Sequence, residues 1–305
     1  MLDQNWWALA AESNFTMERY RTRPGFAVYH GGQMKRPRAC GKQGCRSADS
    51  SAASAGRSSL KMVEPAKQTG SKMNIVLLNG FMTDATLWDD VLPALQAIAS
   101  VTAIDLNAAT SIAEMADLVL AEGPSSFVLI GFSMGGYVAR EVVRKSRGRV
   151  TALILIATSA RGDTQEQAKG KKLAVKLVDP ERFHGLSRGA VQSSLHESRS
   201  TDESMVQRVR TMSERVGVDV FIRHASEPRG GDLDRLHAIT CPTLVIAADG
   251  DRLRSIDEAD ELVHGIAGSG LIVIDGSGHM IPIEQPEALT AVMVAWIETI
   301  MHDTP

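Results

Sequence analysis

The chain has 305 residues, enough for one large domain or two small ones with a sizeable buried core. Its composition, 44% hydrophobic and 23% charged, is typical of a soluble globular protein, and the formal net charge of -3 provides no general attraction to nucleic acid or anionic membranes. We therefore expect a small molecule bound in a pocket, with no nucleic-acid partner and no membrane partner.

Residues 1–72 differ in composition from the rest of the chain. They hold 12 Lys and Arg residues against 5 Asp and Glu residues, so the start is basic while the remainder is acidic. A stretch rich in Ser and Ala at 47–59 buries too little apolar surface to offset its ordering entropy. We predict a disordered, solvated extension rather than a nucleic-acid-binding or targeting arm. A true start at Met73 would also explain the abrupt change of pattern there.

Cysteines and apolar runs limit the chemistry and the location. Cys40, Cys45 and Cys241 do not make a disulfide framework, and the first two lack a second pair to complete a metal knuckle. No structural metal is therefore expected, and Cys241 is predicted to be a small buried thiol beside a core strand. The apolar run at 6–11 is too short for a secretory signal, and no run reaches the roughly 18–20 residues of a membrane span. The cytoplasm is the simplest location.

From Met73 onward, short apolar runs alternate with segments of helical period, the pattern of βαβ units and a mostly parallel sheet. The apolar runs have few polar positions, as expected for strands covered by helices on both faces. The predicted strands lie at 75–78, 101–105, 127–131, 152–157, 243–247 and 271–274. Apolar residues three and four positions apart predict helices at 112–120, 137–146 and 288–300.

The alternation stops at 161–237, where there is no good strand but there are charged helical patterns at 166–178 and 204–216. We predict a helical cap inserted there, between core segments at 73–160 and 238–305. Loops at the carboxyl ends of the strands surround the ligand crevice in open α/β sheets, so an insertion at this position should cover the ligand site.

A serine lies in a G-x-S-x-G motif, Gly131-Phe132-Ser133-Met134-Gly135, between a predicted strand and a helix that runs from about residue 134 to 145. A serine on a tight strand-to-helix turn has a strained backbone, and the two glycines remove side chains that would collide with neighbouring backbone. Such a motif can arise by chance in a glycine-rich turn. The flanking strand and helix favour a nucleophile whose hydroxyl is pushed out of the sheet.

A serine hydroxyl is a poor nucleophile at neutral pH, so it needs a base, and the base needs an acceptor that fixes its tautomer. In this arrangement an acid and then a histidine follow the serine along the chain, each in a loop after a strand. Asp251 and His279 satisfy this order and should reach the sheet edge that holds Ser133. Asp249 and Asp257 are rival acids, but the spacing from the strand end favours Asp251.

Acyl transfer also needs donors for the oxygen that becomes negatively charged. The candidates are the backbone N–H groups of Met134, at the start of a helix, and Phe81, in the turn after the first strand. Gly80 would let that turn bend close to the serine. Asn79-Gly80 is equally compatible with an ordinary turn.

Residues 73–305 resemble the α/β-hydrolase superfamily, in particular compact bacterial serine hydrolases and esterases. The resemblance implies an eight-stranded, mostly parallel sheet shortened at its amino-terminal edge, a helical cap, no cofactor, and a catalytic triad of Ser133, Asp251 and His279. Asn79 stands where many relatives have His, but the adjacent oxyanion donor is a backbone group and should survive. The matching stretches are 77–81 with Trp88, 131–137, 242–246 with Asp251, and Gly278-His279 with Glu284, Pro286 and Glu287.

Within this superfamily, a serine nucleophile argues against haloalkane dehalogenases and epoxide hydrolases, which use Asp, and against dienelactone hydrolases, which use Cys. We predict an enzyme that hydrolyses a small or medium carboxylic ester or lactone through an acyl-enzyme. Thioester hydrolysis and cofactor-free perhydrolysis are also compatible. The alternatives are a carbon-carbon bond hydrolase of a ring-cleavage product, with Arg223, His224 and Arg229 holding a dienoate, and a non-catalytic binder. Acyl length, natural substrate and oligomeric state stay open.

Overall fold

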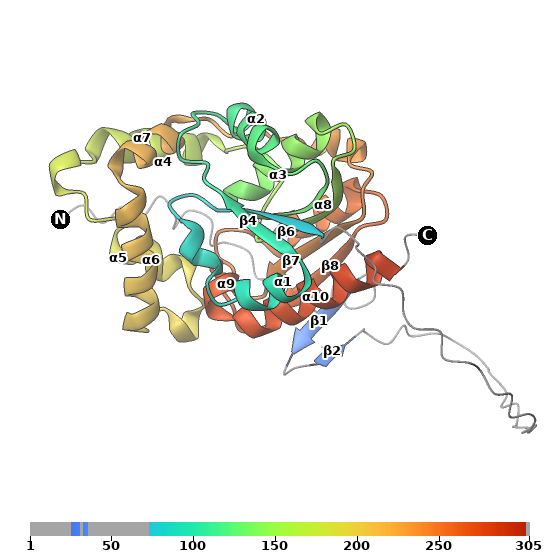
Figure 1. Ribbon diagram of the computed structural model, residues 1–305. Coiled ribbons are helices and arrows are strands. Elements are labelled where there is room, and N and C mark those ends of the chain that lie inside the picture. Colours follow the sequence, from blue (N-terminus) through green and yellow to red (C-terminus); the bar gives the residue numbers. More distant parts are fainter. Residues whose placement is uncertain (1–25, 31–32, 36–72, 303–305) are drawn as a thin grey trace, which may run out of the picture.

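The computed structural model describes residues 26–30, 33–35 and 73–302 (Figure 1). The expectations for Cys40, for Cys45 and for most of the amino-terminal extension fall outside these residues. The described part of the extension contains two strands, β1 (Phe26–His30) and β2 (Gln33–Lys35), where we expected no ordered structure. β1 pairs in parallel with the last strand of the core, so its order comes from a pairing partner about 240 positions further along.

A central sheet with the order β2-β1-β8-β7-β6-β5-β3-β4 organises the described residues. The strands from β3 to β8 correspond to the six predicted strands, and each pairs in parallel with its neighbours. Parallel strands bring their carboxyl ends to one edge of the sheet. These strands are β3 (Asn74–Leu78), β4 (Ser100–Ile104), β5 (Phe127–Phe132), β6 (Val150–Ile156), β7 (Thr243–Ala248) and β8 (Gly270–Ile274).

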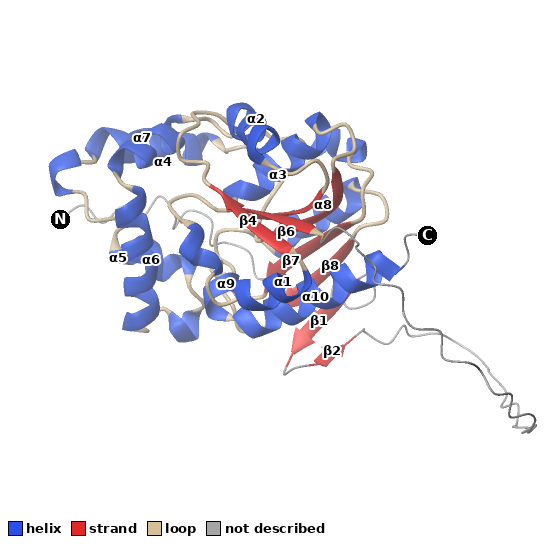
Figure 2. Cartoon of the chain, viewed as in Figure 1, coloured by secondary structure: helices blue, strands red, loops and turns tan. Residues whose placement is uncertain are grey.

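Helices cover both faces of the sheet (Figures 1 and 2). Successive residues of β3 alternate between two apolar clusters, because Ile75 and Leu77 join one and Val76 and Leu78 join the other. The predicted double burial of the central strands is therefore confirmed. One cluster includes α2 (Ile112–Glu122), α3 (Met134–Lys145) and α8 (Ile256–Gly265), and the other includes α1 (Leu92–Ile98) and α10 (Pro286–His302).

β4 differs from this expectation because it lies at the edge of the sheet. Ser100, Thr102 and Ala103 are exposed, whereas Ile104 at its carboxyl end is buried. The covering helices reach the centre of the sheet more completely than its border. An apolar run in the sequence therefore marked the strand correctly but overestimated its burial.

The segment between β6 and β7 is helical, as predicted, and its helices lie together at one end of the molecule (Figure 1). The longer helices begin at clear caps, with a Thr164 and Gln167 capping box on one and Asp202 accepting two backbone N–H groups on the other. Two shorter helices were not predicted. The segment contains α4 (Gln165–Leu177), α5 (Arg188–Ser194), α6 (Glu203–Val216) and α7 (Val218–Ser226).

The two ends of this helical segment lie side by side on the core. The Asp232 N–H donates to the Ala160 carbonyl at 2.9 Å. Arg140 of α3, whose side chain is fully buried, donates to the Ser159 carbonyl at 2.8 Å and to both carboxylate oxygens of Asp232 at 2.9 and 3.0 Å. Burial acts to raise the pKa of Asp232, but Arg140 and Arg144 together hold it below its ordinary value. One arginine thus ties both ends of the segment to the helix that follows Ser133.

Two further properties of the described residues bear on function. None of their helices combines the length and the apolar character needed to cross a bilayer. No group of three or more His, Cys, Asp or Glu side chains among them is arranged to hold a metal ion. Cys241 is a free, half-buried thiol just before β7, and burial raises its pKa.

Candidate active site

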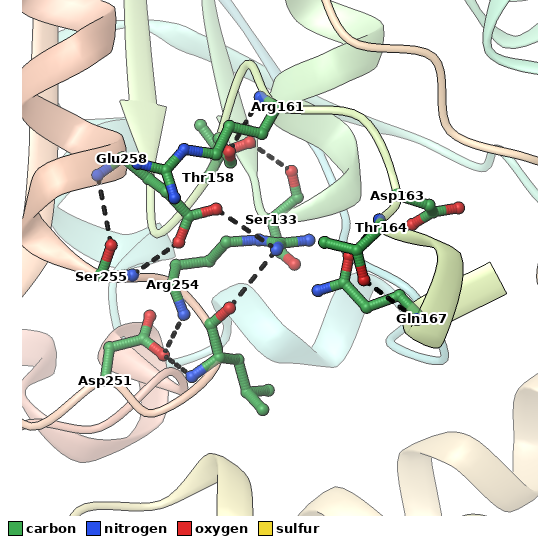
Figure 3. Close-up of polar contacts among 12 residues, drawn as sticks. Ser133, Thr158, Arg161, Asp163, Thr164, Gln167, Asp251, Arg254, Ser255 and Glu258 are labelled. Atoms are coloured by element: carbon green, nitrogen blue, oxygen red, sulfur yellow. Dashed lines mark hydrogen bonds and ion pairs between the residues drawn. The ribbon is translucent and has the colours of Figure 1, made fainter. Parts of the chain in front are cut away.

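Ser133 occupies the turn between β5 and α3 with φ of 51° and ψ of -112°. A positive φ is uncommon for a residue with a side chain, so surrounding contacts must hold it. The Ser133 N–H donates to the Ile156 carbonyl at 2.9 Å, and the Thr158 hydroxyl donates to the Ser133 carbonyl at 2.7 Å (Figure 3). The turn therefore fixes the backbone of Ser133 and leaves its hydroxyl free for other contacts.

The glycines of the motif are required by close backbone packing. A Cβ on Gly131 would lie 2.5 Å from the Gly135 carbonyl oxygen, and a Cβ on Gly135 would lie 2.6 Å from the Leu78 carbonyl oxygen. Gly136 is equally constrained, because its Cβ would lie 2.5 Å from the Thr158 hydroxyl. Only glycine lets α3 begin this close to β3, which explains the pattern seen in the sequence.

The structure brings the three predicted residues into one hydrogen-bonded line. His279 Nε2 lies 2.9 Å from Ser133 Oγ, and His279 Nδ1 lies 2.8 Å from Asp251 Oδ2. The side chains of His279 and Asp251 are 8% and 1% exposed, so water competes little for these contacts. A carboxylate beside Nδ1 favours the proton on that nitrogen, which leaves Nε2 able to accept the serine proton.

Asp251, rather than Asp249, is the carboxylate that contacts His279. Its other oxygen accepts the backbone N–H groups two and three residues further on, at 2.8 and 3.0 Å, which fixes the carboxylate in place. Asp249 instead accepts the Gly276 N–H at 2.8 Å and so connects the two loops. Asp257 lies in the first turn of α8.

Glu284 holds the loop of His279, a role that was not predicted from the sequence. Its buried carboxylate accepts the Gly278 N–H at 2.9 Å and the His196 N–H at 2.7 Å, and burial raises its pKa. The His279 N–H donates to the Ser194 carbonyl at 2.8 Å. Two of these contacts come from the end of α5, so the helical segment helps to position the histidine. Their large sequence separation left no local signal.

The turn after β3 packs directly against the serine turn. A Cβ on Gly80 would lie 2.8 Å from the Phe132 ring and 3.2 Å from Ser133 Cβ. The buried Asn79 amide oxygen accepts the Trp88 indole N–H at 2.7 Å, which anchors the turn. Asn79 therefore has a structural contact of its own, and Gly80 is more than an ordinary turn residue.

Two backbone N–H groups are available beside the serine. Met134 is the first residue of α3, and Phe81 follows Gly80 in the packed turn. Within the described part of the chain, neither N–H donates to a protein acceptor. A helix amino terminus also favours negative charge at this position. These two N–H groups can therefore donate hydrogen bonds to a negatively charged oxygen on a carbon atom that is bonded to Ser133 Oγ.

A pocket opens beside Ser133 and His279, with walls from the core and from the helical segment. Its lining contains both apolar and charged side chains. The apolar side chains are Phe81, Met82, Phe132, Leu186, Ala190, Val209, Leu253 and Met280. The charged side chains are Asp163, Lys171, Arg229 and Arg254. Of these four, only Arg229 was expected from the sequence to contact a ligand.

Arg223 and His224, the other residues considered for a dienoate, contact the core instead. The Arg223 guanidinium donates to the Asn107 carbonyl, and His224 Nε2 lies 3.3 Å from the Ala109 carbonyl oxygen. Burial lowers the pKa of His224, which favours its neutral form. Both side chains hold α7 against the loop after β4, and neither is part of the pocket lining.

A doubly covered parallel sheet with a serine, a histidine and an aspartate at the carboxyl ends of β5, β8 and β7 defines the class of α/β hydrolases. The sequence comparison agrees, because residues 75–292 match the alpha/beta hydrolase family. The chain belongs to this family.

Individual relatives are similar over most of the core. The chain is 24% identical over 229 residues to a pimeloyl-[acyl-carrier protein] methyl ester esterase of Vibrio campbellii, covering 69% of this chain and 89% of the relative. A thermophilic esterase of Thermogutta terrifontis, solved with malate bound, is 28% identical with a TM-score of 0.67, covering 76% of this chain and 92% of that one. An enol-lactonase of Burkholderia xenovorans LB400, 20% identical with a TM-score of 0.63 and covering 76% and 94%, shares the fold.

Proposed function

We propose that this chain is a serine hydrolase that cleaves a carboxylic ester or a lactone of small or medium size. The observation that carries the proposal is the continuous line from Asp251 through His279 to Ser133, with contacts of 2.8 and 2.9 Å. The esterase names of the relatives support an ester as the bond cleaved.

The reaction follows from the positions of these groups. His279 Nε2 takes the proton of the Ser133 hydroxyl as Oγ attacks the ester carbonyl, and the Phe81 and Met134 N–H groups receive the resulting oxyanion. His279 then gives the proton to the leaving alcohol, which breaks the ester bond and leaves an acyl group on Oγ. Water repeats the cycle, with His279 again as base, and releases the acid. Asp251 keeps the imidazole oriented throughout.

We also propose that residues 73–160 and 238–305 form the catalytic core and that residues 161–237 form a cap over it. The pocket supports this division, because its walls come from both parts. The contacts from α5 to the His279 loop indicate that the cap also takes part in positioning the histidine.

The variant Ser133→Ala tests the nucleophile. Removing the hydroxyl should reduce turnover of p-nitrophenyl butyrate by at least about 10³-fold, since the acyl-enzyme can no longer form. Circular dichroism should remain unchanged. The exposed Ser125→Ala variant is the matched control and should keep full activity. Turnover that survives in Ser133→Ala would reject the assignment.

Labelling with a fluorophosphonate separates an enzyme from a non-catalytic binder. The probe should react with the full-length protein and fail to react with Ser133→Ala, because only an activated serine attacks phosphorus readily. Complete inertness of the folded wild-type protein favours a binder. A panel of simple esters, lactones and a vinylogous 1,5-diketone then separates ester, lactone and carbon-carbon bond hydrolysis. For carbon-carbon bond hydrolysis, two of the residues expected to hold the dienoate, Arg223 and His224, do not line the pocket.

A further inference from the structure

The pocket beside Ser133 carries an excess of positive charge that the proposed hydrolysis does not use. Its lining includes three cationic side chains, Lys171, Arg229 and Arg254, and one carboxylate, Asp163. Among the residues that the structure describes, the lining thus has two more positive than negative charges. We call the three cations the cationic wall.

Asp163 forms an ion pair with only one member of the cationic wall. Its carboxylate oxygens lie 2.7 and 2.5 Å from Lys171 Nζ, and one of them also accepts the backbone N–H of Arg229 at 2.9 Å. The paired side chains are 7% and 10% exposed. Burial, followed by the charge of Arg229, lowers the pKa of Lys171 to about 8 despite this pairing. The cations are therefore close enough to repel one another.

Arg254 has donor capacity that the protein leaves unused. Its Nη1 donates to the Leu253 carbonyl at 3.3 Å and lies 3.6 Å from a Glu258 oxygen, a long contact for an ion pair. Its Nε is buried and has no hydrogen-bond partner within the described residues. Figure 3 shows the side chain extending from its loop toward Ser133 and Gln167, which line the same pocket.

The Arg229 side chain also has hydrogen-bond donors without a described partner. Its guanidinium lies 5.7 Å from the centre of the Tyr137 ring. Among the described residues it has no hydrogen bond or ion pair from its side chain. Burial and the charge of Arg254 lower its pKa, so the two guanidinium groups share one poorly solvated region. Burying cationic groups in a poorly solvated region costs free energy unless an anion binds beside them.

We propose that the cationic wall binds a carboxylate carried by the ester substrate, so that the enzyme selects anionic esters. This inference rests on the proposed ester hydrolysis. A planar carboxylate can accept two hydrogen bonds from one guanidinium, and Arg254 offers a buried, unpaired donor in the same pocket as the nucleophile. A purely structural wall would tie the cap to the core and would not distinguish charged from neutral esters.

Paired substrates of equal length test the proposal. Wild-type enzyme should have a higher kcat/KM for monomethyl adipate than for methyl hexanoate, and Arg254→Gln should lower the ratio of the two values at least about tenfold, mainly through KM. The matched control is Arg182→Gln, which removes an exposed arginine of the cap and should leave the ratio unchanged. A ratio that is unchanged in folded Arg254→Gln, whether the carboxylate is placed on the acyl side or on the alcohol side of the ester, would overturn the inference.

Product inhibition in the wild-type enzyme gives the same test without a variant. Adipate should inhibit turnover of p-nitrophenyl butyrate at least about tenfold more strongly than hexanoate, because its second carboxylate reaches the cationic wall. O-acetylglycolate, compared with ethyl acetate, tests a carboxylate on the alcohol side. A preference for it supports the inference with the anion in the leaving group. Equal inhibition by the two acids, together with no preference for O-acetylglycolate, would contradict the inference.

The pH dependence supplies a separate signature. Lys171 loses its charge as the pH rises through about 8, so KM for monomethyl adipate should rise there while KM for methyl hexanoate stays level. A parallel change in both values would count against the cationic wall. Failure of the proposed function is distinguishable, because neither neutral nor anionic esters would then turn over and the fluorophosphonate would not label Ser133. Turnover of neutral esters without selection for anionic ones leaves the function intact and removes this inference alone.

Discussion

At the scale of single residues, the distinction between two neighbouring aspartates is the sharpest feature of the site. Asp251 and Asp249 both accept backbone N–H groups, but Asp251 also contacts His279 Nδ1 at 2.8 Å. An amide at position 251 can present its NH₂ to that nitrogen and so favour the wrong tautomer. We expect Asp251→Asn to lower kcat for p-nitrophenyl butyrate by about 10³- to 10⁴-fold with little loss of stability.

Asp249→Asn is the control for this prediction. An asparagine oxygen at position 249 can still accept the Gly276 N–H, so the connection between the two loops should persist. Its kcat should stay within about threefold of wild type. An equal loss in both variants, measured alongside their thermal unfolding, would show that the site needs the loop connection rather than a carboxylate at position 251.

At the scale of secondary-structure elements, Arg140 joins α3 to the point where the helical segment returns to the core. Arg140→Met would leave the Asp232 carboxylate buried with Arg144 as its remaining cation. We expect the free energy of unfolding at pH 7, measured in urea, to fall by about 3–5 kcal/mol. The double variant Arg140→Met, Asp232→Leu should recover part of this loss, because the buried carboxylate that lost one of its two cations is then removed as well.

The pH dependence of this contact has a definite sign. The pKa of Asp232 is lowered in the folded protein, so its ion pair stabilises the fold above the ordinary carboxyl pKa of 3.8. That stabilisation is lost as the pH falls through the lowered value. The difference in unfolding free energy between wild type and Arg140→Met should therefore shrink in acid. A difference that stays constant from pH 7 into acid would contradict an electrostatic origin.

At the scale of the whole molecule, the amino-terminal strands lie on the edge opposite β4, where β1 pairs with β8 from Phe26 opposite Leu271 to Tyr29 opposite Ile274. Among the described residues, those that line the pocket all lie after Met73. A variant that begins at Met73 should keep its kcat for p-nitrophenyl butyrate within about threefold but unfold at a lower temperature, because the edge of β8 loses its partner. A tenfold loss of kcat would show that β1 helps to position the loop of His279.

The class of fold and the candidate residues for chemistry could be predicted from the amino-acid sequence alone. Apolar runs and helical periods are local properties, so they located the six central strands and the principal helices within a few positions. The serine turn was equally readable, because its glycines are required by backbone crowding within a few residues. The order of Asp251 and His279 after their strands followed from the shared edge of a parallel sheet.

Tertiary structure alone decided the contacts between distant parts of the chain. β1 became a strand because β8 has an open edge, and Glu284 acquired its role because α5 folds back onto the loop of His279. Lys171, Arg229 and Arg254 belong to separate segments and meet only when the helical segment closes over the sheet. Local sequence patterns describe which residues lie on one strand or helix face, whereas the position of one element against another is set by packing across the whole molecule.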